Sequence, residues 1–425
     1  MTPETRAARA TPSVPYALVG LLAAALTINY VDRGTVSTAA PLLEKELHLS
    51  TSQTFLMLSA FFWTYVPSQP LMGWLADRIG AARVLAGGVA LWSLSTCLAG
   101  VSHGVVQLIG LRLLMGVGES CFYPSALALL SQRVSDTHRV RATAVMQLGG
   151  VIGPALGTFV GGLVMVRYGW RTMFLGMGLA SLLWLLPWSG QLRAAKRLAP
   201  VQRTIGGPSF PLILRQRALW GTILGNFCSN YAFYFVFTAL PLYLVDERGL
   251  SLLSMTRFQS VLYLVDAGSM LASGWILDGW VRRGASISLA YKSALVLSAA
   301  GVGMSLIAAS GANATTGAWL LLGTGLADGL TNPAVCALTQ RFAGPLACGR
   351  WMGVQNAISN TAGILAPIVT GQLVLAAGGH YALALWVTGT VALLGLLGWL
   401  VIVPQVRPVD WSQIATGRDG PVPIG

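Results

Sequence analysis

Four ionisable side chains, Asp32, Arg33, Arg112 and Glu119, lie within stretches of sequence that are otherwise apolar. A carboxyl group in apolar surroundings is protonated more readily than one in water, so these acids are suited to carry protons. An arginine guanidinium binds a carboxylate through two parallel hydrogen bonds, so the arginines are suited to receive an organic anion. The alternative is structural, because buried charges of opposite sign also neutralise one another in ion pairs.

The spacing of these four residues limits how they can face one another. Arg112 and Glu119 are seven residues apart, which is about two turns and 10 Å along a helix, so they share one face. Asp32 and Arg33 are adjacent and therefore point about 100° apart around a helix axis. We expect one of these two to meet the substrate and the other to meet a neighbouring helix. The sequence leaves open which acid pairs with which arginine.

Several uncharged polar side chains in similar stretches could form hydrogen bonds with a polar substrate. Taken singly, each is also explained by packing between helices or by a position at the membrane interface. The set comprises Tyr65, Gln69, Gln147, Tyr231, Tyr234, Asn356 and Asn360.

Two further acids, Asp266 and Asp328, lie in the second half of the chain. They could bind a hydroxyl, an ammonium group or a proton, or they could form ion pairs with Arg257 or Lys292. If they line the substrate cavity, their negative charge favours a monoanionic or zwitterionic substrate over a dianion.

The elements that carry these residues are expected to be membrane-spanning helices. Of the 425 residues, 54% are hydrophobic and only 10% are charged, whereas a soluble domain has about 25% charged residues. A helix needs about 20 apolar residues to cross a bilayer, and the glycine-rich stretches lack the period of two that is typical of a β-barrel. We predict an all-α integral membrane protein with twelve spans, near residues 16–40, 54–76, 84–101, 105–131, 143–165, 172–190, 218–244, 253–277, 288–309, 316–340, 351–376 and 382–403.

The net charge of +13 indicates the orientation in the membrane and not binding to nucleic acid. Basic residues concentrate near both termini and in the breaks after every second span, with six of them between Arg193 and Arg217. Short segments rich in Lys and Arg stay in the cytoplasm. We therefore expect both termini to be cytoplasmic, in a cytoplasmic (inner) membrane. We also expect the first span to be retained, because it lacks the cleavage site of a signal peptide.

The longest polar break divides six expected spans from six. This break is basic and contains several prolines, as is common in linkers. The expected organisation is a cytoplasmic segment (1–15), an N-terminal six-helix bundle (16–190), a cytoplasmic linker (191–217), a C-terminal six-helix bundle (218–403) and a cytoplasmic tail (404–425).

An internal repeat supports this division into halves. Residues 73–77 read Gly-Trp-Leu-Ala-Asp and residues 274–278 read Gly-Trp-Ile-Leu-Asp, each at the end of an expected span and each followed by arginines. Parallel repeats of this kind are common in secondary transporters.

The first copy of the repeat and the arginines after it, together with the layout of six helices plus six, resemble the major facilitator superfamily along nearly the whole chain. In this interpretation Gly73 allows two helices to approach closely, and Asp77, Arg78 and Arg83 form a polar latch at the cytoplasmic rim, with Asp278 as the counterpart of Asp77. The alternative is that the arginines only reflect the bias of positive residues towards the cytoplasm.

Further motifs are more specific. They are Asn29-Tyr30-x-Asp32-Arg33, Ser59-Ala60-Phe61-x-Trp63-x-Tyr65-x-x-x-Gln69-x-x-x-Gly73, Arg112-x-x-x-Gly116-x-x-Glu119-x-x-x-x-Pro124, Gly169-Trp170-Arg171, Tyr231-x-x-Tyr234, Leu240-Pro241-x-Tyr243-Leu244 and Asn356-x-x-x-Asn360. Together they resemble the anion:cation symporter family, which includes sugar-acid and aromatic-acid transporters and the relatives of sialin. Some of them also recur in lipid-exporting spinster proteins.

The resemblance to the symporter family implies roles for the four buried charges. Asp32 and Glu119 would couple proton movement, and Arg33 and Arg112 would lie near the anion or gate its path. One position departs from the family, whose members often have a glutamine in the middle of the fifth helix. This chain has Gly150 there and Gln147 one turn away.

The sequence therefore predicts a proton-coupled symporter that imports a small organic anion, such as a sugar acid or an aromatic carboxylate, by alternating access. The alternative is an exporter or antiporter of a drug or an amphipathic lipid on the same fold. The sequence has no visible nucleophile and base pair, metal-ligand spacing or nucleotide-binding loop, so we expect no enzyme activity, cofactor or metal. The expected partners are the anion, protons and the lipid bilayer, and the protein is expected to be a monomer.

Overall fold

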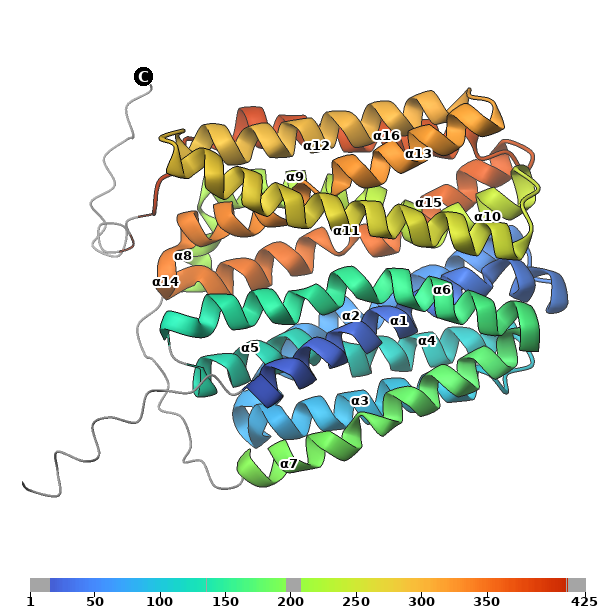
Figure 1. The fold of residues 1–425 in the computed structure, drawn as a ribbon, viewed down its shortest axis with the longest axis horizontal. Coiled ribbons are helices and arrows are strands. Elements are labelled where there is room, and N and C mark those ends of the chain that lie inside the picture. The colour runs from blue at the N-terminus through green and yellow to red at the C-terminus, as the bar shows by residue number, and fades with distance from the viewer. Residues whose placement is uncertain (1–15, 135, 196–207, 410, 412–425) are drawn as a thin grey trace, which may run out of the picture. The chain divides into compact units, whose positions relative to one another are not determined.

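The computed structural model describes residues 16–134, 136–195, 208–409 and 411, and its secondary structure in these ranges is entirely helical (Figure 1). The chain divides into two compact units, which are described separately. The first unit comprises residues 1–49, 60–201 and 252–260, and the second comprises residues 50–59, 202–251 and 261–425.

The first part of the chain forms eight helical elements. The helix that ends at Ala99 is followed by Gly100, and the helix that ends at Glu119 is followed by the small residues Ser120 and Cys121. One short π-helical turn links the second helix to the third. The elements are α1 (Tyr16–Glu46), α2 (Thr51–Leu75), η3 (Ala76–Gly80), α3 (Ala81–Ala99), α4 (Val105–Glu119), α5 (Phe122–Arg133), α6 (Asp136–Leu183) and α7 (Leu185–Ala195).

The second part of the chain forms eleven elements in the described residues. They are α8 (Phe210–Leu214), α9 (Arg217–Thr238), α10 (Leu240–Leu242), η4 (Tyr243–Glu247), α11 (Leu252–Arg282), α12 (Ile287–Ser310), α13 (Ala314–Asp328), α14 (Thr331–Ser359), α15 (Ala362–Ala376), α16 (Ala382–Leu396) and η5 (Leu397–Ile402). Local signals fix several of their ends. Ser286 and Asn313 cap α12 and α13, because each side chain accepts a hydrogen bond from a backbone N–H of the first turn.

Two of the long helices contain a break at a glycine. α6 has 48 residues, which is far more than one bilayer crossing requires, and Gly169 interrupts it with a φ of 82°. Gly344 interrupts α14 in the same way, with a φ of 63°. Only glycine adopts this left-handed backbone without a steric penalty. The break at Gly169 falls between two of the spans that the sequence predicts, 143–165 and 172–190.

Seven helical stretches are long and apolar enough to cross a membrane, and an eighth is added if a pair bent by 42° counts as one span. This supports a multi-pass membrane protein, but it does not reach the predicted twelve. Charge is one reason, since α1 contains both Asp32 and Arg33 near its middle. The stretches are 78–99, 105–130, 142–193, 252–281, 287–310, 350–376 and 382–402, with 217–238 and 240–247 as the bent pair.

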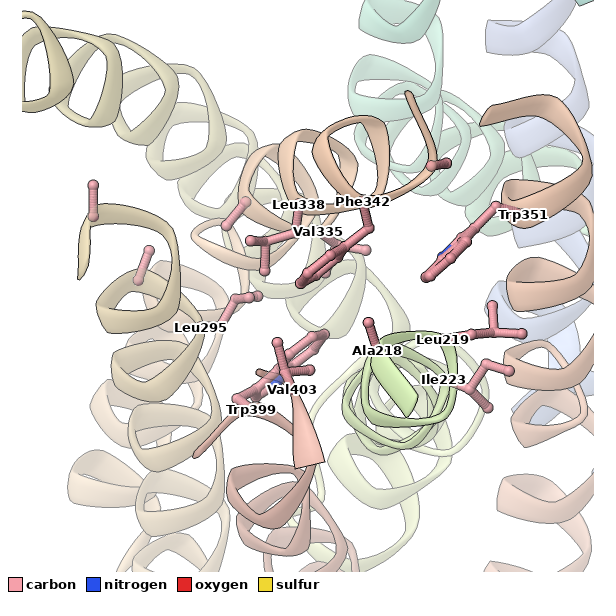
Figure 2. Packing of buried hydrophobic residues seen from close by; sticks show 14 of the residues in the cluster. Ala218, Leu219, Ile223, Leu295, Val335, Leu338, Phe342, Trp351, Trp399 and Val403 are labelled. Atoms are coloured by element: carbon pink, nitrogen blue, oxygen red, sulfur yellow. The ribbon is translucent and has the colours of Figure 1, made fainter. Parts of the chain in front are cut away.

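The second unit has an apolar cluster built around aromatic rings (Figure 2). The rings of Phe342 and Trp351 are stacked with centroids 6.1 Å apart, and Trp411 meets Trp351 edge-on at 6.4 Å. Gly225 of α9 makes room for the indole of Trp399, since a Cβ atom at this glycine would lie only 2.6 Å from Cδ2. These contacts tie η5 to α9, and they tie the chain after η5 to α14.

The motif Gly169-Trp170-Arg171 fastens the second part of α6 to the end of α1. The indole of Trp170 donates a hydrogen bond to Glu46 Oε2 at 2.6 Å, and Arg171 forms an ion pair with the same carboxylate. Hydrogen bonds from Arg171 and Trp170 hold the pKa of Glu46 below its usual value. The motif is therefore structural in the first unit.

Small residues bring α1 and the first part of α6 into close contact. Gly149, Gly153 and Gly157 are spaced four residues apart on α6 and face α1 between Ala23 and Val31. A Cβ atom at Gly153 would lie 2.7 Å from Tyr30 Cβ, and one at Gly157 would lie 2.8 Å from Val31 Cα. Such close approach is typical of membrane helices, whose association depends on van der Waals packing. This contact fixes the position of α1 and of the charged residues it carries.

We expect Gly153→Ala to destabilise the protein by about 1 to 3 kcal/mol, because the added methyl group must push α1 and α6 apart. Gly176→Ala on the same helix is the matched control, since no atom lies within 4 Å of the Cβ it adds. Thermal unfolding in detergent measures both. Equal melting temperatures for the two variants would contradict the tight α1–α6 contact.

Candidate functional site

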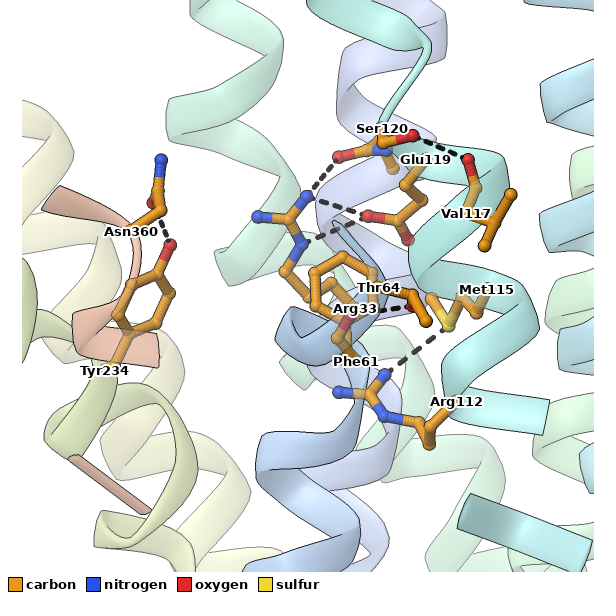
Figure 3. A network of polar contacts seen from close by, with 11 residues as sticks. Arg33, Phe61, Thr64, Arg112, Met115, Val117, Glu119, Ser120, Tyr234 and Asn360 are labelled. Carbon is orange, nitrogen blue, oxygen red and sulfur yellow. Dashed lines mark hydrogen bonds and ion pairs between the residues drawn. The ribbon is translucent and has the colours of Figure 1, made fainter. Parts of the chain in front are cut away.

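A buried ion pair lies at the centre of the first unit. Arg33 of α1 donates to Glu119 Oε2 at the end of α4, from Nη2 at 2.8 Å and from Nε at 3.1 Å (Figure 3). Nη2 also donates to Asn29 Oδ1, one turn earlier on α1, at 3.1 Å. The two side chains are 5% and 0% exposed, so water cannot replace these bonds. The pair joins residues that are 86 positions apart in the sequence.

Aromatic rings surround the guanidinium group of Arg33. Its Cζ atom lies 4.6 Å from the ring centroid of Phe61, 4.9 Å from that of Tyr65 and 5.0 Å from that of Tyr30. Phe61 and Tyr65 are stacked on one another along α2. The negative π faces stabilise a cation, so these rings would partly compensate Arg33 if Glu119 lost its charge.

Arg112 is equally buried, at 4% exposure, but it has no ion pair within the described part of the chain. Its Nη1 atom contacts only the sulfur of Met115, at 3.4 Å, and its Nε atom has no hydrogen-bond partner in the same residues. The guanidinium lies 5.1 Å from the ring of Phe61, so this ring serves both arginines. An uncompensated buried cation is costly unless an anion binds there. Arg112 is therefore a candidate anion receptor.

Close packing of α2 and α4 positions this cluster. Gly116 allows the contact, since a Cβ atom there would clash with Phe61 O and Thr64 Oγ1 of α2. Thr64 Oγ1 also donates to Leu113 O at 2.6 Å. The sequence suggested Gly73 as a point of close approach, but its Cβ would lie at an ordinary distance of 3.8 Å from Pro124 Cβ. The role of Gly73 at the cytoplasmic rim therefore stays a prediction.

Asp32 lies on a different side of α1 from Arg33. Its Oδ2 atom accepts a hydrogen bond from Ser181 Oγ of α6 at 2.7 Å. Its side chain is fully buried, and Oδ1 has no hydrogen-bond partner among the residues that the structure describes. The indole N–H of Trp92 on α3 is likewise buried and is a second side-chain donor near this carboxyl group. The adjacent charges of α1 therefore occupy two separate environments.

The two acids of the second unit line one pocket. Asp266 of α11 and Asp328 of α13 are half-buried and form no hydrogen bond or ion pair with other described residues, including Arg257 and Lys292. The centre of a water molecule can occupy about 10 Å³ of this pocket, so the pocket has room for about one water molecule. The other lining residues are Ala232, Phe233, Val236, Leu262, Tyr263, Val302, Thr324 and Gly325.

The uncharged candidates differ in their surroundings. Tyr234 Oη donates to Asn360 Oδ1 at 2.6 Å, which joins α9 to the end of α14 (Figure 3). Tyr231 is buried one turn before Tyr234, and Asn356 is half-buried one turn before Asn360. In the first unit, Tyr65 contacts Arg33. Gln69 is half-buried, and Gln147 Oε1 is buried without a partner among the described residues.

The expected cytoplasmic latch is described only in part. The guanidinium of Arg78 lies 5.1 Å from the ring centroid of Trp74, and Arg83 donates to Ile79 O at 3.3 Å. The side chains of Asp77 and Asp278 lie outside the described residues. The latch therefore stays a prediction.

The sequence did not indicate every contact of the site. Asn29, Tyr30 and Phe61 belong to the quoted motifs, but nothing in the sequence showed that they contact Arg33. Ser181 could not be found from the sequence, because its partner Asp32 lies 149 positions away.

Comparisons with known proteins agree with this architecture. The sequence profile of the Major Facilitator Superfamily matches residues 22–343. The "Hexuronate transporter" of Bacillus subtilis (strain 168) is 28% identical, over 93% of this chain and 95% of its own length. The "D-galactonate transporter" of Escherichia coli O6:H1 is 27% identical, over 90% and 94%. The "Probable galactarate/D-glucarate transporter" of Bacillus subtilis (strain 168) is 26% identical, over 97% of both chains.

Two solved structures have a similar fold. The inward-facing, unoccupied structure of a bacterial homologue of the human lysosomal transporter Spinster has a TM-score of 0.78 at 16% identity, and it covers 93% of this chain and 98% of that one. The D-xylose-proton symporter has a TM-score of 0.76 at 13% identity, with coverage of 93% and 99%. At this identity the likeness concerns the fold alone.

The two arginines should affect stability in opposite ways. We expect Arg33→Leu to destabilise the protein by about 3 kcal/mol at alkaline pH, because it leaves Glu119 charged and buried without its ion pair. Arg112→Leu should leave stability unchanged or raise it, since it removes a buried charge that lacks a counter-ion. Thermal unfolding of purified protein in detergent measures both. A large loss of stability in Arg112→Leu would mean that this arginine has an anionic partner. The double variant Arg33→Leu with Glu119→Leu should recover much of the stability that Arg33→Leu alone loses, because no buried charge of the ion pair remains.

Proposed function

Because the chain belongs to the Major Facilitator Superfamily, and is accordingly a multi-pass membrane transporter and not an enzyme, we propose that it is a proton-coupled symporter. Its substrate is a small organic anion, such as a sugar acid or an aromatic carboxylate, and import occurs by alternating access. The observation that carries the proposal is the buried guanidinium of Arg112, which has no ion pair among the described residues and lies near the Arg33–Glu119 ion pair.

The relatives support a sugar acid in particular. Their names specify hexuronate, D-galactonate, galactarate and D-glucarate, which all combine carboxylates with several hydroxyl groups. Arg112 suits the carboxylate, because a guanidinium can donate two parallel hydrogen bonds to it. Hydroxyl groups can donate to carboxylate and amide oxygens and can accept from a tyrosine hydroxyl, and the second unit has side chains of these kinds in Asp266, Asp328, Asn360 and Tyr234. We therefore rank sugar acids above aromatic carboxylates as substrates.

Charge balance gives the coupling mechanism. With both acids ionised, the charges of Asp32 and Glu119 offset those of Arg33 and Arg112, so the cluster is neutral and gains little by binding an anion. Protonation of Glu119 breaks its charge-assisted bonds with Arg33 and leaves a net positive charge. A substrate carboxylate then restores neutrality. Proton and anion thus favour each other's binding, and by thermodynamic linkage each raises the affinity for the other.

The aromatic rings around Arg33 fit this mechanism. When Glu119 is protonated, the guanidinium loses its anionic partner while still excluded from water. Cation–π contacts with Tyr30, Phe61 and Tyr65 contribute about 0.5 to 2 kcal/mol each in such surroundings, so they lower the free energy of the protonated state. Phe61 contacts Arg112 as well and is in a position to keep the two arginines apart.

The remaining features of the proposal concern topology. We propose twelve crossings in two bundles, 16–190 and 218–403, joined by a cytoplasmic linker at 191–217, with residues 1–15 and 404–425 cytoplasmic. The membrane is the cytoplasmic one, and the transporter acts as a monomer. The distribution of Lys and Arg supports this orientation.

The direct test is uptake into proteoliposomes. We expect an inward proton gradient to drive accumulation of a radiolabelled sugar acid, and we expect substrate to make the external medium more alkaline, because protons enter with the anion. A panel of hexuronate, galactonate, galactarate, benzoate and an uncharged sugar identifies the substrate class, and Arg112→Ala should abolish uptake. Unchanged accumulation after collapse of both the pH gradient and the membrane potential, without sodium, would rule out proton coupling.

Glu119→Gln separates binding from coupling, because the amide resembles the protonated acid. We expect this variant to bind substrate over a wider pH range and to retain exchange, while it loses accumulation driven by a pH gradient. Binding as a function of pH and gradient-driven uptake are measured on the same preparation, with Glu119→Asp as the control that keeps a titratable group. If Glu119→Gln accumulates substrate with the wild-type dependence on the gradient, Glu119 is only a structural counter-ion.

A further inference from the structure

The hydroxyl group of Ser181 has two acceptors within reach and only one hydrogen. Its Oγ atom lies 2.7 Å from Asp32 Oδ2 on α1 and 2.9 Å from Met177 O on its own helix. A serine hydroxyl donates one hydrogen bond and can accept two. It can therefore serve only one of these oxygens as a donor at any moment, and the two hydrogen bonds are alternatives.

Which alternative forms depends on the proton of Asp32. An ionised carboxylate only accepts hydrogen bonds, so Ser181 must then donate to Oδ2. A protonated carboxyl group has a hydrogen of its own, which it can donate to Ser181 Oγ, while the serine hydrogen turns to Met177 O. No heavy atom has to move between these states, because both distances are already short enough for a hydrogen bond.

The surroundings make this exchange important. Asp32 is fully buried and Ser181 is 3% exposed, so water cannot supply the missing donor or acceptor in either state. A polar group left unsatisfied in such a place is destabilising. With leucine or alanine in place of Ser181, both forms of Asp32 would lose their partner, and the ionised form would lose more, since hydrogen bonds to charged groups are the stronger ones.

The position of Ser181 is fixed by its own helix. One turn earlier on α6, Gly178 packs directly against α3, since a Cβ atom there would lie 2.6 Å from Cys97 N and 2.7 Å from Ser93 O. One turn later, the indole of Trp184 donates to Leu21 O of α1 at 3.0 Å. Contacts on both sides therefore hold the hydroxyl at hydrogen-bond distance from Asp32.

We propose that Ser181 is a positioning residue for proton coupling: it allows Asp32 to bind and release a proton inside a closed pocket by reversing the direction of one hydrogen bond. The inference rests on the proposed role of Asp32 as a proton-coupling residue. The other ionisable groups near Asp32 are Cys97 on α3, Glu119 on α4 and the adjacent Arg33 on α1. Arg33 is engaged with Glu119, so Ser181 is the hydroxyl donor to the ionised Asp32 among the described residues, and the indole N–H of Trp92 on α3 is the other side-chain donor near this carboxylate.

The test is an infrared titration of the carboxyl band of purified protein across about pH 3 to 10, a range that brackets the usual pKa values of carboxyl groups and the raised values of buried ones. It is performed in the Glu119→Gln background, so that one acid is removed. The band that disappears in Asp32→Asn belongs to Asp32. We expect Ser181→Ala to move the midpoint of this band upward by about one to two pH units, a 10- to 100-fold higher proton affinity.

Matched variants separate this role from packing. Ser181→Cys keeps nearly the same shape but has a weak donor, so it should behave like Ser181→Ala, whereas Ser181→Thr keeps the hydroxyl and should keep the wild-type midpoint. Ser95→Ala removes a buried hydroxyl of α3 that is bonded only to Leu91 O, and its midpoint should not move. A wild-type midpoint in both Ser181→Ala and Ser181→Cys, or the lack of any band that depends on Asp32, would overturn the inference.

The titration needs neither substrate nor gradient, so it is independent of the transport assay. A shifted midpoint together with uptake that does not depend on protons would refute the proposed symport, and with it the part of Ser181 in coupling, but it would leave standing the effect of Ser181 on the proton affinity of Asp32. Proton-driven uptake together with an unshifted midpoint would refute only the role of Ser181.

Discussion

The burial of charge inside an apolar helical bundle is the constraint on which the rest of this structure depends. Ionised groups removed from water must be paired, neutralised by a proton or compensated by a ligand. The four buried charges of the first unit have three different surroundings. Arg33 and Glu119 form an ion pair, Asp32 is fully buried with a single hydroxyl donor, and Arg112 has no counter-ion within the described residues. In the proposed mechanism these charges balance when both acids are ionised, and each proton that binds is matched by the negative charge of a substrate anion.

Packing decides where each of these charges is placed. The glycines of α6 bring this helix against α1, and Gly116 brings α4 against α2. The contact with α6 fixes the position of α1, and the helix directs its adjacent residues Asp32 and Arg33 into different environments. In the proposed mechanism, a proton on one acid and an anion near the arginines influence each other through their charges, without a hydrogen bond between the two acids.

The aromatic residues give this arrangement tolerance to a change of charge. An ion pair alone is stable in one protonation state, since removal of one charge leaves the other unpaired. The rings of Phe61, Tyr65 and Tyr30 stabilise a cation without carrying a charge themselves. In our proposal Ser181 stabilises both forms of Asp32, because its hydroxyl donates to the ionised carboxylate and accepts from the protonated carboxyl group. Both devices allow a buried group to change its charge at a modest cost, which is what a transport cycle requires.

The sequence by itself determined the class of protein and the residues that matter. Apolar stretches of sufficient length specify membrane helices, the rarity of charge within them singles out Asp32, Arg33, Arg112 and Glu119, and the motifs lead to the family that the comparisons identify. Helix geometry also predicted that Asp32 and Arg33 would face different neighbours, because residues on a helix are separated by a fixed angle. The same geometry predicted that Arg112 and Glu119 share one face of their helix, but it did not predict that these two residues form no ion pair in the described part of the chain.

Only the tertiary structure decided the partners. Glu119 binds Arg33 rather than Arg112, Asp32 meets Ser181, and Phe61 lies against both arginines. Gly116 is a glycine that the close contact of α2 and α4 requires. These facts depend on which helices are neighbours and on their rotation, and those follow from packing between residues far apart in the chain. Local sequence fixes the period of a helix, but the choice of partner is made by the fit of whole helix surfaces, which no single segment contains.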